Sequence, residues 1–179
     1  MELNEGKVFL FTFDEIRVLL CSLGFTSCEG IFMPGKDYTG QKVLQTVNGL
    51  VRRGLLEVPE DLRDREYQAC PGKEQFVMRP WLYQMMMAMG NPSGTMIYRP
   101  GEKYPGYPEE LYSGPEYFCY FLPDYCLLTE RDWTRKESMR LRAMDMKAFT
   151  AWRQEQEEEA EKAGKNGAES DGPALEAIL

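Results

Sequence analysis

The chain has 179 residues, of which 43% are hydrophobic and 28% are charged, and its formal net charge is −8. The apolar content is too high for a disordered chain, and the length suits one domain with a core of its own. The sequence contains no histidine, so it lacks the commonest general base and the commonest metal ligand.

The five cysteines do not follow a metal-binding or disulfide-framework pattern. The closest pairs, Cys21 with Cys28 and Cys119 with Cys126, are seven residues apart, whereas zinc ligands occur in pairs about two to four residues apart. There is no glycine-rich phosphate loop, and no pair of carboxylates falls in a predicted cleft. We therefore expect no catalytic residue, no metal and no cofactor, and predict a non-enzymatic protein.

Most of the negative charge lies near the C-terminal end. Residues 155–179 contain eight acidic and two basic residues, and the run from Gly164 to Pro173 is rich in turn formers. We predict one globular α+β domain over 1–154, followed by an acidic helix end and a disordered tail over 155–179. An acidic chain without a signal-peptide pattern, and without an apolar stretch of about 20 residues, is expected in the cytoplasm, away from membranes and nucleic acid.

The first predicted helix begins with a capping box formed by Thr12 and Glu15. Phe11 before the cap and Ile16 after it fit a hydrophobic staple. Apolar residues then recur at helical spacing until Gly24, which favours a left-handed helix end.

A second helix is predicted from Thr39, as N-cap, to Gly54, followed by an extended segment, Leu55–Val58. Two helices and an extended segment in this order are typical of a winged helix. The alternative function that this order suggests is a DNA-binding transcriptional regulator. Gln45, Arg52 and Arg53 would be its contacts, although positive charge on this helix is sparse.

A short strand over Phe76–Met78 and a third helix over Trp81–Met89, with Pro80 in its first turn, are predicted next. Met85, Met86 and Met89 suit an irregular core. Because residues 85, 86 and 87 are all methionine, they cannot all point inward, and we expect at least one to be exposed or at an interface.

The second half of the chain predicts strands at Thr95–Arg99, Tyr117–Leu122, Tyr125–Glu130 and Ser138–Met144. Ser138–Met144 alternates between apolar and basic residues as a strand does, but its composition also favours a helix. Asp145 is placed to cap a last helix, in which Phe149 and Trp152 are the large apolar anchors. The fold class predicted from this order is α+β: winged-helix-like N-terminal helices packed with a mostly antiparallel sheet, and a C-terminal helix.

The order of these segments resembles the EspG-type proteins that accompany type VII secretion systems. The residues that carry the resemblance are VFLFTFDEIRVLLCSLGF at 8–25, LVRRGLLEV at 50–58, RPWLYQMMMAMGNPSGTMIYRP at 79–100 and EYFCYFLPDYCLLTERD at 116–132. The resemblance implies a short aromatic strand before the first helix, and a chaperone or adaptor that holds an export substrate in the cytoplasm. The chain is shorter than the fuller members of that family.

We therefore predict a protein-binding chaperone or adaptor whose partner, such as a helical export substrate, docks an amphipathic segment on exposed methionine and aromatic side chains. The contacts predicted are Met86, Met87, Tyr104 and Tyr107. The two tyrosines belong to a Pro/Gly/Tyr loop, and tyrosine is enriched at protein interfaces.

Overall fold

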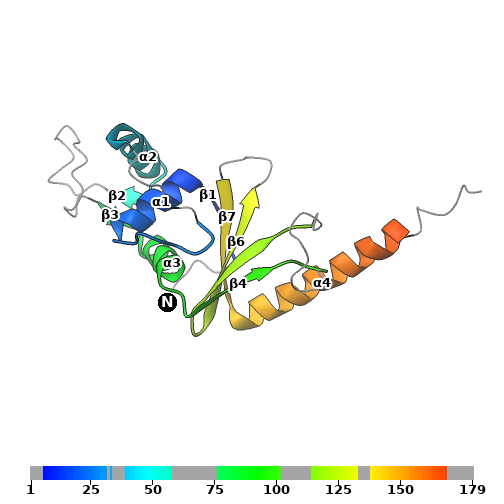
Figure 1. Cartoon of the computed structure of the whole chain (residues 1–179). Helices are drawn as coiled ribbons and strands as arrows, with labels where there is room; N and C mark the ends of the chain where they lie inside the picture. The colour runs from blue at the N-terminus through cyan, green and yellow to red at the C-terminus, as the bar shows by residue number, and fades with distance from the viewer. Residues whose placement is uncertain are drawn as a thin grey trace, which may run out of the picture.

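The computed structural model describes residues 6–31, 33, 39–57, 76–101, 114–132 and 138–168. Its main sheet has five strands in the order β1-β7-β6-β5-β4, and every neighbouring pair is antiparallel. The strands are β1 (Val8–Thr12), β4 (Gly94–Tyr98), β5 (Tyr117–Phe121), β6 (Tyr125–Asp132) and β7 (Ser138–Asp145). Helices α1, α2 and α3 lie on one side of this sheet and α4 lies on the other (Figure 1). The α+β prediction is confirmed.

The segment from Ser138 is a strand, so the helical alternative for it is wrong. β7 is paired on both sides, with β1 and with β6, and Phe11 of β1 lies opposite Met139. Met139, Leu141 and Ala143 belong to the core on the α1–α3 side. The alternation seen in the sequence thus separates a buried face from one that carries the basic residues.

Helix α1 (Phe13–Ser22) starts at the predicted capping box. The Thr12 N–H donates to Glu15 Oε2 at 2.9 Å, and the Glu15 N–H donates to Thr12 Oγ1 at 3.1 Å. Phe11 and Ile16 are both fully buried. Gly24 follows the helix with φ +85°, a conformation that strains residues with a Cβ.

Helix α2 (Gly40–Arg52) is capped by Thr39, whose Oγ1 accepts the N–H of Lys42 at 3.4 Å. Strands β2 (Leu56–Glu57) and β3 (Val77–Met78) then form a separate antiparallel pair. The order of two helices and an extended segment on which the winged-helix interpretation rests is therefore present. Helix α3 (Pro80–Gly90) begins with proline in its first turn, as predicted.

The core between α1–α3 and the sheet contains the methionines of α3. Met85 and Met86 are fully buried, and Met89 is 1% exposed. The prediction that Met86 contacts a partner is therefore wrong, because the side chain fills the core between α3 and the sheet. The flexible thioether chains fill an irregular space there, which is a usual role of methionine in cores.

Helix α4 (Met146–Ala168) begins where Asp145 Oδ1 accepts the N–H of Ala148 at 2.6 Å, as predicted. It packs on the opposite face of the sheet through Phe149 and Trp152. The domain boundary predicted at 154 falls inside this helix, and residues 164–168, predicted to belong to the tail, continue it because an existing helix extends at little cost. Residues 169–179 lie outside the described residues.

Among the described helices, none combines the length and the apolar character that crossing a bilayer requires. The longest of them, α4, is rich in glutamate.

Candidate functional site

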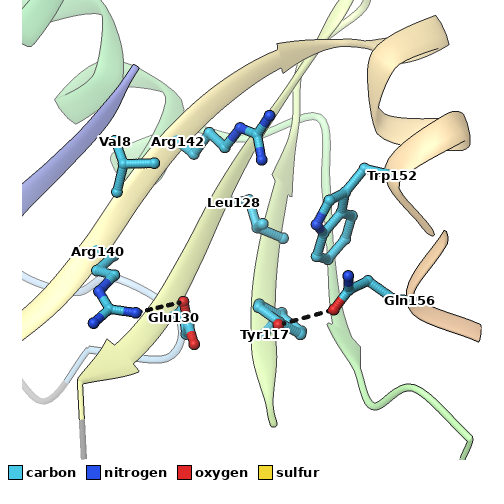
Figure 2. Close-up of a pocket in the computed structure, with 8 residues that line it drawn as sticks. All are labelled: Val8, Tyr117, Leu128, Glu130, Arg140, Arg142, Trp152 and Gln156. Atoms are coloured by element: carbon cyan, nitrogen blue, oxygen red, sulfur yellow. Dashed lines mark hydrogen bonds and ion pairs between the residues drawn. The ribbon is translucent and has the colours of Figure 1, made fainter. Parts of the chain in front are cut away.

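An open groove lies on the α4 side of the sheet, between β1 and β7 on one side and α4 on the other (Figure 2). Its volume is about 310 Å³, and its lining comes from β1, β5, β6, β7 and α4. The lining residues are Val8, Tyr117, Leu128, Glu130, Arg140, Arg142, Trp152 and Gln156. The groove exists because α4 packs on the strands towards β4 and leaves this part of β7 and β1 uncovered.

Strand register arranges the floor of the groove in two rows. In the first row, Arg142 of β7 lies opposite Val8 of β1 on one side and opposite Leu128 of β6 on the other. One step along the same face, Arg140 and Glu130 are opposite one another, and Glu130 is opposite Tyr117 of β5. An apolar row with one arginine therefore lies beside a polar row.

Two contacts hold the polar row. An ion pair joins Arg140 Nη1 and Glu130 Oε2 at 3.6 Å. The Tyr117 hydroxyl donates to Gln156 Oε1 at 3.2 Å and so ties β5 to α4. Arg142, in the other row, has a buried Nε without a hydrogen-bond partner.

Aromatic packing sets the position of the α4 wall. The Trp152 ring meets Tyr117 edge-on at 4.9 Å between centroids and Tyr98 at 5.6 Å. Phe149, one helical turn before Trp152, is 5% exposed. The Tyr98 hydroxyl has two acceptors for its single proton, the Arg153 carbonyl at 3.1 Å and Glu157 Oε1 at 2.9 Å. Burial, reinforced by the Glu157 carboxylate, raises the pKa of the Tyr98 phenol, so it stays a neutral donor.

Cys119 and Cys126 lie buried beneath α4. The hydrogen bond to Cys119, together with burial, raises the pKa of the Cys126 thiol. Burial likewise raises the pKa of Cys28 in the other core. Cys28 and Cys126 therefore stay protonated and act as small apolar groups. Within the described residues no three His, Cys, Asp or Glu side chains come together as a metal site.

The four residues predicted as protein contacts differ in their burial and in whether the structure describes them. Met86 is buried, as described above, and Met87 is half-buried on α3, one helical turn after Tyr83, which is 44% exposed. Tyr104 and Tyr107 lie outside the described residues. Neither Met86 nor Met87 lines the groove.

The residues of the DNA-binding alternative are only partly available. Gln45 and Arg52 are exposed on one face of α2. Arg53, however, forms an ion pair with Glu15 at 2.7 Å, and Lys42 forms one with Asp14 at 2.9 Å. Two of the three basic residues in this helix and its C-cap are thus paired with α1, which leaves little positive charge to neutralise phosphates.

The sequence indicated part of the groove without identifying it. Its alternation placed Arg140 and Arg142 on the face away from the α1–α3 core, and Trp152 was predicted to anchor the last helix. What was missed is that α4 leaves this basic part of the face open, since no local pattern specifies where a helix crosses a sheet.

No protein-family model matches the chain, and no curated protein matches it either. The resemblance to EspG-type proteins therefore stays a prediction.

Proposed function

We propose that this protein is a non-enzymatic adaptor or chaperone that binds another protein through the groove between β7 and α4. The observation that carries the proposal is the composition of the groove, which brings together one tryptophan, one tyrosine and two arginines. These are the residue types that contribute most binding energy at protein interfaces. Val8 adds an apolar edge that is 56% exposed.

The shape of the groove favours a peptide segment as the partner element. A volume of about 310 Å³ is at the lower end for ligand pockets, so it accommodates a few side chains of one segment. Its floor consists of hydrogen-bonded strands, so little conformational entropy is lost there on binding.

The narrower hypothesis is that the partner is a helical export substrate of a type VII secretion system, held in the cytoplasm. Its support is the resemblance of the order of elements to EspG-type proteins. Neighbouring genes that encode a membrane ATPase and small helical proteins would support it. A gene that stands alone at a promoter would favour the DNA-binding regulator instead.

Site-specific photocross-linking of the full chain in its native host tests the protein-binding proposal. A photoreactive phenylalanine analogue replaces Val8, which is 56% exposed at the groove, or Ile97, which is 48% exposed and lies on the other face of the sheet. We expect one discrete protein adduct from position 8 and none from position 97. The purified partner should then bind the full chain in isothermal titration calorimetry. Absence of an adduct from position 8, or equal adducts from both positions, would contradict the proposal.

Titration of duplex DNA at several salt concentrations tests the competing function. A DNA-binding regulator would show tight binding that weakens steeply with salt, because bound counterions are released from DNA. We expect no such binding, since Lys42 and Arg53 are already paired with α1.

A further inference from the structure

The described side chains that line the groove carry two positive charges and one negative charge. Two arginines and one glutamate line it, and the glutamate is paired with Arg140. Arg142 has no ion pair within the part of the chain that the structure describes, so one positive charge remains over the floor. Glu159 accepts a hydrogen bond from Gln156 at 3.5 Å, and Figure 2 shows Gln156 at the opposite end of the groove from Arg142.

The Arg142 side chain is buried at its Nε atom, which has no hydrogen-bond partner. A buried donor without a partner is costly, and native proteins rarely keep one unless water or a ligand completes it. In Figure 2 the guanidinium extends into the space between β7 and α4, and the indole nitrogen of Trp152 faces the same space. A carboxylate that enters there can accept two parallel hydrogen bonds from a guanidinium.

Apolar side chains lie directly opposite Arg142 on the two neighbouring strands. Its neighbours across the sheet are Val8 and Leu128, and Trp152 closes the opposite wall. Low polarity around an ion pair strengthens its attraction, and the flanking side chains can receive an apolar group next to the carboxylate. The complementary ligand is therefore a carboxylate with aliphatic neighbours.

We propose that the groove binds an acidic, aliphatic peptide segment of the partner protein, with an Asp or Glu carboxylate on the Arg142 guanidinium and an aliphatic side chain between Val8 and Trp152. This inference rests on the proposed protein-binding function and specifies the chemistry of the partner.

The test uses the full chain and three capped synthetic heptapeptides in which leucine alternates with glutamate, glutamine or lysine. Side-chain NMR of ¹⁵N-arginine-labelled protein follows the Nε–H resonance of Arg142. We expect the glutamate peptide to shift this resonance and to bind at least about tenfold more tightly than the glutamine peptide, with the lysine peptide weakest.

Arg142→Met and Arg140→Met are the matched variants. Arg142→Met should reduce binding of the glutamate peptide by about tenfold, to the level of the glutamine peptide. It should not lower thermal stability, because the buried Nε that it removes has no hydrogen-bond partner. Arg140→Met removes the same charge but leaves the Arg142 guanidinium in place, and because Arg140 and Glu130 are both partly exposed and screened by solvent it should lower affinity by no more than about threefold. If Arg142→Met fails to fold, the wild-type Nε–H shift decides the question.

Equal binding of the glutamate and glutamine peptides would overturn the inference, as would preference for the lysine peptide. The inference would also be overturned if the Arg142 Nε–H resonance were already shifted without peptide and moved when the chain was truncated after residue 168. The occupant of the groove would then be the acidic end of this chain. If Val8 cross-links a partner whose affinity is unaffected by Arg142→Met, this inference fails while the proposed function stands. If no partner is cross-linked, the proposed function itself fails.

Discussion

Arg53 and Glu15 join the end of α2 to the beginning of α1. Arg53 Nη1 donates to both carboxylate oxygens of Glu15 at 2.7 Å, and Nη2 donates to the Leu10 carbonyl of β1 at 2.6 Å. The guanidinium also lies 5.3 Å from the centre of the Phe11 ring. The same carboxylate accepts the Thr12 N–H, so one buried glutamate completes the N-terminal cap of α1 and positions α2.

Glu15→Gln should therefore lower the free energy of unfolding by about 1–2 kcal/mol, because it removes the charge from this hydrogen-bonded group. Arg53 is partly exposed, so screening limits the contribution of the ion pair itself. Asp14→Asn is the control: Asp14 pairs with the exposed Lys42 and, on α1 itself, with Arg17, and the loss of these two solvent-screened pairs should cost less, about 0.5 kcal/mol. Urea denaturation measures both, and equal effects would show that the Glu15 carboxylate has no special role.

Two glycines in helices should respond to alanine in opposite ways. A Cβ on Gly49 of α2 would meet no heavy atom within 4 Å, whereas a Cβ on Gly90 of α3 would overlap the Phe25 ring. Gly49→Ala should stabilise the protein by about 0.5–1 kcal/mol through helix propensity. Gly90→Ala should destabilise it by about 1–3 kcal/mol through overpacking. Thermal and urea unfolding curves report both signs, and a neutral Gly90→Ala would mean that the Phe25 ring moves aside at no cost.

Loss of the Phe149 anchor should release α4 and expose the thiols beneath it. Phe149 is 5% exposed and contacts Phe121, while Cys119 and Cys126 are fully buried in the same cluster. Phe149→Ala should cost about 3 kcal/mol and make both cysteines react with iodoacetamide. Mass spectrometry of the alkylated peptides measures the reaction at each cysteine.

Lys147→Ala, at an exposed position of α4, is the control and should leave both thiols protected. Cys28, in the core on the other side of the sheet, should also stay protected in Phe149→Ala. Simultaneous labelling of all three would indicate global unfolding and would contradict a local release of α4.

The buried phenols predict a loss of stability at alkaline pH. Burial raises the pKa of Tyr98, with the Glu157 carboxylate adding to the effect, and burial also raises that of Tyr120. An unfolded chain releases each phenol proton near an ordinary pKa of about 10, whereas the folded state keeps it. The folded state then holds more protons, so the free energy of unfolding falls as pH rises above about 10.

Tyr98→Phe should make this fall shallower, by up to about 1.4 kcal/mol per pH unit, since one titrating group is removed. At neutral pH the variant loses only the hydrogen bonds to Arg153 and Glu157, at a cost of about 1 kcal/mol. Chemical denaturation at a series of pH values gives both quantities. An unchanged alkaline slope would show that Tyr98 titrates alike in the folded and unfolded states.

Local features of this fold were predictable because their partners lie within a few positions of one another. The Thr12–Glu15 capping box, the Thr39 cap and Pro80 at the start of α3 each involve one helical turn. The alternation along Ser138–Met144 separated its apolar from its basic residues as a strand does, although its composition left a helix as the alternative. In each case the backbone geometry of one element relates neighbouring residues directly.

Tertiary structure alone decided which faces meet. Periodicity shows that side chains share a face, but it does not specify the surface on which that face packs. Sequence therefore left open that Met86 is buried, that Arg53 reaches Glu15, and that Phe11 pairs with Met139 across most of the chain. The groove depends on this same level of structure, because it exists only where α4 leaves Arg140 and Arg142 uncovered on a sheet assembled from distant strands.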